Sequence, residues 1–238
     1  MAALIFAAGL GTRFKPWTNQ HPKALAVVNG KPLLQRNIEY LQQYGINNIV
    51  VNVHHFASQI IDAVKSNNGW GSHISISNES NEVLETGGGL LKAKALLGSQ
   101  TILTINVDIL TNLDLHRFFT YHRQQQALIT LAITNRSTSR YLLFNQANRL
   151  CGWRNTKTSA EKIVAPQPTP LIENAYSGIA LFEPAVFDLI PFTGKFSLID
   201  VYLALAPHHK IVGCDHSGDK LIDVGKPESV TIAEQLFT

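Results

Sequence analysis

Residues 2–16 read AALIFAAGLGTRFKP and contain the feature that decides the fold. Residues 2–8 are a continuous apolar run, typical of a buried strand, and a glycine-containing turn follows over residues 9–13. The first 38 residues hold no Asp or Glu, but they hold five basic side chains: Arg13, Lys15, Lys23, Lys31 and Arg36. A glycine turn exposes backbone N–H groups, and basic side chains add positive charge beside them. This combination predicts a polyphosphate site, and hence a nucleotide.

The turn differs from two common nucleotide-binding motifs. A dinucleotide fingerprint needs glycine where Phe14 stands, and an acidic residue about 20 positions further on, which is absent. A Walker A loop needs Gly-Lys-Ser/Thr, which does not follow the turn. A strand, then GxGTR, then Pro16 and Pro22-Lys23 is a more specific pattern than a lone pair of glycines.

The first half of the chain alternates strand and helix patterns. Further strands are expected at 49–53, 74–76, 101–107 and 127–134, and helices at 32–45, 56–64, 90–97 and 114–125. Such alternation predicts parallel strands with helices on both faces. The expected fold class is therefore α/β: a Rossmann-like mixed, mainly parallel sheet flanked by helices.

The second half is less regular and predicts a small β-rich portion. We expect a hairpin from 141–144 and 149–153, a loop or flap over 156–170, a strand at 176–182, a helix at 198–206, a strand end at 221–225 and a last helix from Pro227 to Leu236. We expect one domain over 1–238, with a nucleotide-binding part at 1–135 and a sugar-binding part at 136–238.

Bulk composition argues against several classes of protein. The 238 residues are 45% apolar and 16% charged, with a net charge of only +3, so we expect no nucleic-acid partner. Cys151 and Cys214 have no metal-ligand spacing and predict two reduced thiols. No apolar run approaches the ~18 residues that span a membrane, and no basic segment precedes the first strand as in a signal peptide. We expect a cytoplasmic protein without a membrane partner; its oligomeric state is open.

Two aspartates follow apolar strands and are candidate metal ligands. Asp108 ends the run 101–107, and Asp223 lies in the run 221–225. Ligands of an open parallel sheet bind beyond the carboxyl ends of its strands, where the turn at Gly9 also lies. A lone Asp in this place is also a common helix cap or turn residue. Beside a polyphosphate site the pair predicts one Mg²⁺, which uses one or two carboxylates plus substrate phosphates.

Glu85-Thr86-Gly87-Gly88-Gly89 precedes an expected helix and is unusual. Three glycines carry an entropic penalty of roughly 1 kcal/mol each relative to alanine. We interpret them as allowing a ligand to approach the backbone closely; a flexible loop is the alternative.

These residues resemble the signature of the sugar-1-phosphate nucleotidyltransferases: a strand, GxGTR, and a Pro-Lys a few residues on. The resemblance extends along the chain. Its segments are Glu85–Gly89 at the family's nucleobase and sugar loop, Asp108 and Asp223 at the two metal positions, and Tyr176-Ser177-Gly178-Ile179 at the sugar-site strand. The ETGGG sequence and the short length are most similar to N-acetylmuramate-1-phosphate uridylyltransferases, with mannose- and heptose-1-phosphate guanylyltransferases close by.

The resemblance implies a role for each matching residue. Asp108 and Asp223 would hold Mg²⁺, and Arg13 and Lys23 would be the catalytic residues. The sugar would contact Gly88 and Gly178. The residues that would contact the nucleotide are Ala8, Gly9, Gly11, Thr12, Arg13, Lys23, Thr86 and Gly87. The implied reaction joins an NTP to a sugar 1-phosphate and releases pyrophosphate. The NTP that the resemblance favours is UTP or GTP. The resemblance leaves the identity of the nucleobase and of the sugar open. It also does not decide which charged residues of the sugar-binding part shape the sugar pocket; the candidates are Glu161, Glu173, Lys195 and Asp200.

Two positions depart from the family pattern. Val107 stands where the family usually has glycine before the metal Asp, and Asn112 where close relatives often have Asp. Val107 could crowd the nucleotide, or it could simply continue the apolar strand. Two other readings therefore stay open: a catalytically silent nucleotide-sugar-binding regulatory module, and a cytidylyltransferase acting on an alcohol phosphate such as phosphocholine. The second would need clustered aromatic side chains, but Trp17, Trp70 and Trp153 are scattered in the sequence.

Overall fold

A ten-stranded mixed sheet forms the centre of the computed structural model, which describes residues 1–165 and 170–237. Its strand order is β11-β10-β9-β12-β6-β1-β4-β5, with β8 beside β12 and β13 beside β8. The ten strands are β1 (Ala2–Phe6), β4 (Asn48–Val53), β5 (His73–Asn78), β6 (Ile102–Asn106), β8 (Ile129–Thr134), β9 (Arg140–Phe144), β10 (Leu150–Asn155), β11 (Ala160–Ile163), β12 (Ile172–Phe182) and β13 (Ile211–Asp215).

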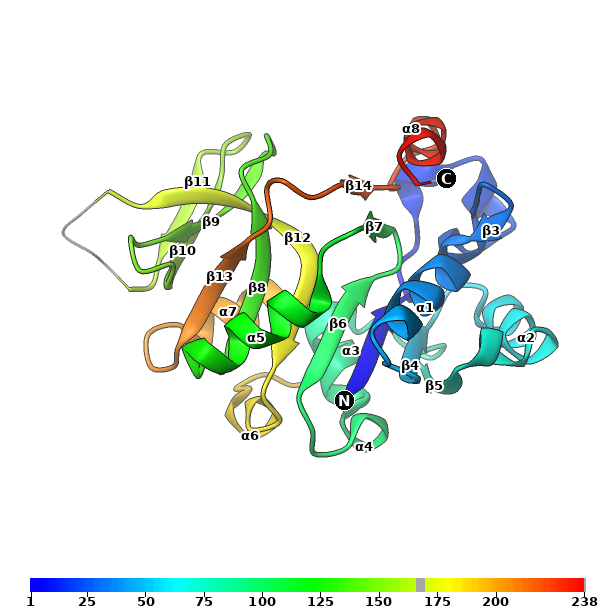
Figure 1. Ribbon diagram of the computed structural model, residues 1–238, viewed down its shortest axis with the longest axis horizontal. Helices are drawn as coiled ribbons and strands as arrows, with labels where there is room; N and C mark the ends of the chain where they lie inside the picture. Colours follow the sequence, from blue (N-terminus) through cyan, green and yellow to red (C-terminus); the bar gives the residue numbers. More distant parts are fainter. Residues whose placement is uncertain (166–169, 238) are drawn as a thin grey trace.

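The nucleotide-binding side of the sheet is parallel. β1 pairs in parallel with β4 and β6, and β4 pairs in parallel with β5. Every residue of β1 is buried, as a continuous apolar run between two layers of helices requires. Figure 1 shows these strands ending at one edge of the sheet, where the turn after β1 also lies. The predicted α/β class with a parallel core is confirmed.

The other side of the sheet is largely antiparallel. β12 pairs antiparallel with β6, β8 and β9, and so joins the two sides into one sheet. The predicted hairpin is confirmed as β9 and β10. The loop expected over 156–170 is wrong in part, because Ala160–Ile163 pairs with β10 as strand β11. The polar–apolar alternation of this strand is too short to recognise in the sequence. Residues 166–169 of the expected loop lie outside the described residues. β13, parallel to β8, was not predicted.

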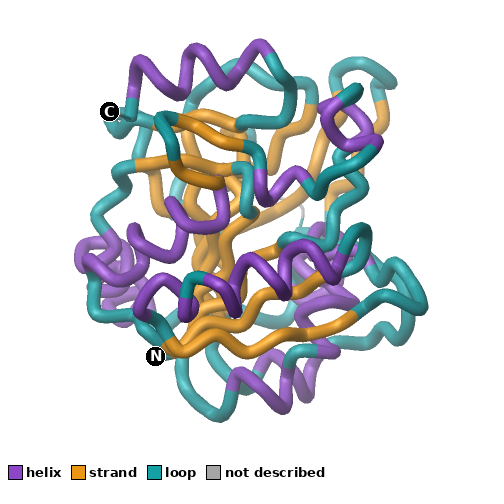
Figure 2. Tube along the Cα trace, turned by 90° about the vertical axis from the view of Figure 1, so that its right-hand side faces the viewer, coloured by secondary structure: helices purple, strands orange, loops and turns teal. Residues whose placement is uncertain are grey.

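Helices cover both faces of the sheet, as Figure 2 shows. They are α1 (Leu33–Gln43), α2 (Ala57–Ser66), α3 (Glu85–Lys92), α4 (Lys94–Leu97), α5 (Leu115–Gln125), α6 (Val186–Leu189), α7 (Leu198–Leu205) and α8 (Glu228–Leu236). Short 3₁₀ helices are η1 (Thr12–Phe14), η2 (Trp17–Asn19), η3 (Lys23–Leu25) and η4 (Asn68–Gly71). Alternate residues of β1 enter different cores: Ile5 packs with α1, α2 and α5, and Leu4 with α3, α4 and α7.

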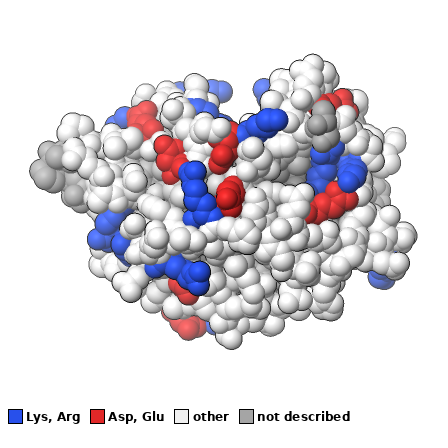
Figure 3. Space-filling model, viewed as in Figure 1, with Lys and Arg blue, Asp and Glu red and all other residues white. Residues whose placement is uncertain are grey.

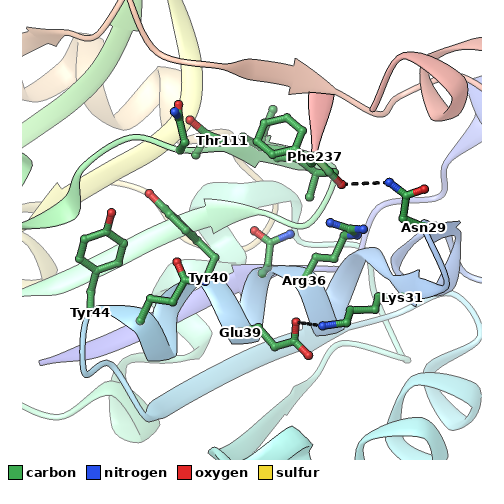
Figure 4. Close-up of a pocket in the computed structure, with 13 residues that line it drawn as sticks. Asn29, Lys31, Arg36, Glu39, Tyr40, Tyr44, Thr111 and Phe237 are labelled. Carbon is green, nitrogen blue, oxygen red and sulfur yellow. Dashed lines mark hydrogen bonds and ion pairs between the residues drawn. The ribbon is translucent and has the colours of Figure 1, made fainter. Parts of the chain in front are cut away.

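Two small ladders lie outside the main sheet. β2 (Val27–Val28) pairs with β3 (Lys31–Pro32), and β7 (Ile109–Thr111) pairs with β14 (Leu221–Asp223), both antiparallel. Asn29, in the turn between β2 and β3, holds the last helix: its Nδ2 donates to the carbonyls of Glu234 at 2.8 Å and Phe237 at 3.0 Å. Figure 4 shows the contact between Asn29 and Phe237 beside a cavity of about 450 Å³ between α1, β7 and Phe237, which is the hollow in the right half of Figure 3.

Among residues 1–165 and 170–237, no helix has the length and apolar character needed to cross a membrane.

Candidate active site

The turn after β1 is held in place by two polar side chains. Asn52 Oδ1 accepts the N–H groups of Ala7 at 2.7 Å and Ala8 at 3.3 Å. Thr18 Oγ1 donates to the carbonyl of Gly11 at 2.9 Å. Gly11 has φ +59°, and a Cβ there would lie 2.8 Å from Thr18 Cγ2, so only glycine fits this position. Gly9 instead faces open space.

The turn leaves backbone donors available. Within residues 1–165 and 170–237, the N–H groups of Gly9, Leu10 and Gly11 have no protein acceptor. Phe14 N–H closes the 3₁₀ turn on the carbonyl of Gly11 at 2.8 Å. Free N–H groups in a tight turn form a concavity for anions. The predicted polyphosphate turn is thus present as a geometry, although the N–H of Ala8 is already used by Asn52.

The β7–β14 ladder brings the two predicted metal ligands together. Asp223 is paired with Ile109, and Val224 N–H donates to the carbonyl of Asp108 at 2.8 Å. Figure 1 shows β7 and β14 lying beyond the end of β6, next to the parallel edge of the sheet. Two carboxylates 115 positions apart in sequence therefore meet at the edge where ligands of such sheets bind.

Basic side chains surround this pair. Lys23 Nζ contacts Asp108 Oδ2, and both side chains are largely buried, at 14% and 13% exposed. Arg13 Nη2 lies 3.8 Å from Asp223 Oδ2, in a more exposed position. The predicted residues Arg13, Lys23, Asp108 and Asp223 are thus brought into one cluster of alternating charge.

The pKa of Asp223 is raised above its ordinary value. Burial is the main cause and repulsion from Asp108 the next, while Arg13, Lys23 and Arg136 oppose the shift. Two carboxylates that repel each other are a donor set that a divalent cation stabilises, so the residues present fit Mg²⁺. In the described part of the chain, no group of three or more His, Cys, Asp or Glu side chains forms a metal cluster, so the remaining oxygens would come from substrate and water.

A cavity of about 170 Å³ lies between the turn and the aspartates. Its lining includes Gly9, Lys23, Thr86 and Asp108, four of the predicted site residues. Phe6, Ala7, Ala24, Asn106 and Val107 complete the lining. Segments from four parts of the sequence therefore converge on one small space.

The glycines after Thr86 are packed by protein. Gly87 and Gly88 lie in the first turn of α3 rather than in a loop, and their N–H groups donate to the carbonyl of Phe196 at 3.0 and 3.2 Å. A Cβ on Gly87 would lie 2.4 Å from the Phe196 ring, and one on Gly88 2.3 Å from the carbonyl oxygen of Gly194. The close approach that the sequence analysis attributes to a ligand is made here by a neighbouring segment. Contacts of Gly87 and Gly88 with substrate stay predictions.

Gly178 has a similar packing role. It adopts φ +77° in β12, where the register with β8 shifts between Tyr176 and Ala180. A Cβ there would lie 2.8 Å from Asn106 Nδ2. Glycine therefore lets Asn106 reach the small cavity, and contact of Gly178 with the sugar stays a prediction.

The two departures from the family pattern have local explanations. Val107 is only 4% exposed, belongs to the core on the α1 face, and its carbonyl accepts Asn37 Nδ2 at 2.9 Å. It continues the apolar strand. Asn112 Oδ1 accepts the N–H of Lys220 at 2.6 Å, so the amide holds the segment that leads into β14.

A second, larger cavity adjoins the aspartates on the side of the antiparallel strands. It measures about 710 Å³, and its lining includes Arg13, Asp223 and residues of the β9–β10 hairpin. Most side chains that line this cavity were not predicted as site residues from the sequence. They are Arg136, Thr138, Ser139, Arg140, Tyr141, Trp153, Asn155, Lys157, Thr158, Tyr176 and Ile199. The signal that could have found some of them is the polar run after β8, at a strand's carboxyl end.

The four charged residues that the sequence offered as candidates for the sugar pocket do not line this cavity. Glu161 and Glu173 form ion pairs with Arg154, and Asp200 forms a capping box with Ser197 at the start of α7. Lys195 Nζ lies 3.8 Å from Glu85 Oε1. Each has a partner elsewhere in the fold.

One buried chain of polar groups has the residue types of a nucleophilic triad. Ser177 Oγ lies 2.8 Å from His216 Nε2, and His216 Nδ1 lies 3.5 Å from Asp219 Oδ2. Ser177 is fully buried, so no substrate reaches its Oγ. Burial also lowers the pKa of His216. The chain instead links the Gly178 strand to the loop that precedes Asp223.

The fold and the site fit a class: α/β enzymes that act on the phosphates of a nucleotide. Comparison with known proteins identifies its family. The family model described as nucleotidyl transferase matches residues 2–236. N-acetylmuramate alpha-1-phosphate uridylyltransferase of Neisseria meningitidis serogroup B is 32% identical over 225 residues, covering 94% of this chain and 93% of that protein. The protein of the same name from Caulobacter vibrioides is 30% identical over 241 residues, covering 98% and 95%.

A solved structure supports the fold. HddC from Yersinia pseudotuberculosis, complexed with GMP-PN, aligns with a TM-score of 0.79 and 24% identity over 100% of this chain and 99% of that one. The chain belongs to the nucleotidyl transferase family and is a sugar-1-phosphate nucleotidyltransferase.

Proposed function

We propose that the protein joins UTP to N-acetylmuramate 1-phosphate, producing UDP-N-acetylmuramate and pyrophosphate. The observation that supports this most directly is the convergence of Gly9, Lys23, Thr86 and Asp108 on one cavity beside Asp223. The two relatives reported above at 30% identity or more both carry this activity in their names.

The turn after β1 binds the triphosphate. The free N–H groups of Gly9, Leu10 and Gly11, with that of Thr12, donate to phosphate oxygens, as backbone donors do in other anion-binding turns. Arg13 neutralises charge on the leaving pyrophosphate. Ala8 is a neighbour of the nucleotide without a free N–H, and Thr86 is the residue of the ETGGG segment that lines the nucleotide cavity.

The reaction needs positioning and charge neutralisation more than proton transfer. An anionic oxygen of the sugar 1-phosphate attacks the α-phosphorus of UTP, the new P–O bond forms, and the bond to the bridging oxygen of pyrophosphate breaks in line. Because the nucleophile is already an anion, no general base is required. The barrier comes from bringing two anions together, so fixed positive charge at the reacting oxygens lowers it.

Lys23 is the side chain best placed for this role. Its Nζ lies against Asp108 in a largely buried position, where electrostatic interactions are stronger than in water. We assign it to the α-phosphate and the incoming phosphate together. Asp108 and Asp223 would hold Mg²⁺, which supplies positive charge to the α-phosphate when bound.

An alternative acceptor is an alcohol phosphate such as phosphocholine. Tyr141, Trp153 and Tyr176 do line the larger cavity, but so do Arg13, Arg136, Arg140 and Lys157 against the one carboxylate of Asp223. This excess of positive charge repels a quaternary ammonium and attracts an anion. The cavity therefore favours a sugar phosphate.

A pyrophosphate-release assay with Mg²⁺ tests the proposal. Each common NTP and dTTP is crossed with N-acetylmuramate, N-acetylglucosamine, glucose, mannose and heptose 1-phosphates. We expect the highest kcat/KM with UTP and N-acetylmuramate 1-phosphate. A higher value with GTP and mannose or heptose 1-phosphate would replace both substrates, and NTP binding without any release would indicate a silent module.

A further inference from the structure

Four cations line the larger cavity, and they divide into two groups. Arg13 Nη2 lies 3.8 Å from Asp223 Oδ2, and Arg136, just after the end of β8, lines the same cavity. Arg136 Nη2 also donates to the carbonyl of Tyr176 at 3.1 Å, next to the strand of Gly178. Arg140 is the first residue of β9, and Lys157 lies in the turn between β10 and β11. Figure 1 shows β9 and β10 on the far side of β12 from β14, so we place Arg13 at the Asp223 end of the cavity, and Arg140 and Lys157 at the opposite end.

The hairpin register places the second pair together. Arg140 is directly opposite Asn155, which also lines the cavity, and residues in such pairs have side chains on the same face. Lys157 follows in the turn after β10, where its N–H donates to Asn155 Oδ1 at 3.0 Å. Leu142 and Trp153 are the next pair on this face, so a hydrophobic wall adjoins the two cations.

The other face of the hairpin is neutralised. Arg154 forms ion pairs with both Glu161 and Glu173. Arg140 and Lys157 form no ion pair with any carboxylate within residues 1–165 and 170–237. The same hairpin thus carries a compensated cation on one face and two uncompensated cations on the face that lines the substrate cavity.

We propose that Arg140 and Lys157 bind a carboxylate carried by the sugar of the sugar 1-phosphate. The inference rests on the proposed function, since it assigns the larger cavity to that substrate. The phosphate is held at the Asp223 end, so a second anion at the hairpin end must belong to the sugar itself. N-acetylmuramate has such a group in its lactyl ether, and N-acetylglucosamine is the same sugar without it. The two residues determine specificity and take no part in bond breaking.

The test compares these two sugar 1-phosphates with UTP and Mg²⁺. The double variant Arg140→Gln/Lys157→Gln is matched by Arg149→Gln/Lys65→Gln, which removes one arginine and one lysine from exposed positions that do not line the cavity. Loss of charge-assisted hydrogen bonds to a carboxylate should lower kcat/KM for N-acetylmuramate 1-phosphate by about 10- to 100-fold, mainly through KM. The value for N-acetylglucosamine 1-phosphate should change less than about 3-fold, and the matched control should change neither.

Two results would overturn the inference while the proposed function stands. The wild type could use both acceptors equally well, or the double variant could lose activity equally with both. A third comparison separates failure of the proposed acceptor from failure of the inference. If glucuronate 1-phosphate is preferred to glucose 1-phosphate in an Arg140- and Lys157-dependent way, the carboxylate site is correct and the acceptor is a different acidic sugar. If no acceptor reacts, binding is measured instead, with protein that is loaded with Mg²⁺ and a non-hydrolysable UTP analogue. Each sugar 1-phosphate with a carboxylate is compared with its counterpart that lacks it. Equal binding of the two would overturn the inference.

Discussion

Asp108 and Asp223 are joined through the backbone, because the N–H of Val224 donates to the carbonyl of Asp108 at 2.8 Å. The three-residue ladder between β7 and β14 brings the two carboxylates close together, and burial with mutual repulsion raises the pKa of Asp223. Lys23 and Arg13 offset part of this repulsion, and a divalent cation bound between the carboxylates would offset more of it. The prediction that the two aspartates hold Mg²⁺ rests on this relationship.

Asp108→Asn should therefore reduce turnover by at least ~10²-fold, the scale of losing one electrostatic stabiliser of the transition state. The amide keeps the shape but removes one of the two negative charges. Pyrophosphate release at saturating substrate measures the effect. Asp62→Asn, at an exposed position of α2, is the control and should behave like the wild type. An Asp108→Asn enzyme with a near-normal rate would remove Asp108 from the metal site.

Lys23→Ala should also reduce turnover by at least ~10²-fold, because the largely buried ammonium group offsets the negative charge of the reacting phosphates. The matched control is Lys65→Ala, at the exposed end of α2. Measuring kcat and KM separately identifies the step: a fall in kcat indicates transition-state stabilisation, whereas a rise in KM alone would mean that Lys23 only binds substrate.

The main elements of the fold were predictable from local patterns. Leu33, Leu34, Ile38 and Leu41 have helical spacing, and all four are fully buried on α1. Continuous apolar runs likewise predicted β1, β4 and β6. The turn at Gly9 and the positions of Asp108 and Asp223 followed from the rule that ligands bind at the carboxyl edge of such a sheet.

The rest depended on long-range pairing that no local pattern contains. β7 and β14 are only three residues each, and only their pairing shows that the two aspartates meet. Arg140 enters the cavity because of its register opposite Asn155. The packing reason for Gly87 also lies more than 100 positions away, at Phe196, so a ligand was the nearest explanation in the sequence.

Gly87→Ala should lower the free energy of unfolding by roughly 1–3 kcal/mol, the usual effect of overpacking a core position. The added methyl group would lie 2.4 Å from the Phe196 ring and 2.9 Å from its carbonyl oxygen. Urea unfolding without nucleotide measures it. Gly218→Ala has open space and should change stability by less than about 0.5 kcal/mol. If Gly87→Ala is as stable as the wild type but binds UTP poorly, the ligand interpretation is the correct one.

Glu79→Gln should stabilise the protein relative to the wild type as pH rises. Glu79 is 1% exposed; its Oε1 accepts Asn52 Nδ2 at 2.8 Å, and its Oε2 has no partner in the described part of the chain. Burial raises the pKa of this carboxyl group above its ordinary value of 4.5. A raised pKa means that its contribution to stability is fully present below the unfolded-state pKa and is lost as pH rises through the folded-state pKa.

Glutamine does not ionise, so the variant avoids that loss while keeping an oxygen for Asn52. The difference in unfolding free energy should shift towards the variant as the pH rises from the unfolded-state pKa of about 4.3 through the raised folded-state pKa, by about 1.4 kcal/mol for each unit of pKa elevation. Urea unfolding at several pH values measures this slope. Glu82→Gln, at an exposed position three residues along, should show no such slope. Parallel stability curves for wild type and Glu79→Gln would mean that burial does not disfavour the charge of Glu79, because the Asn52 amide and its surroundings solvate the carboxylate as well as water does.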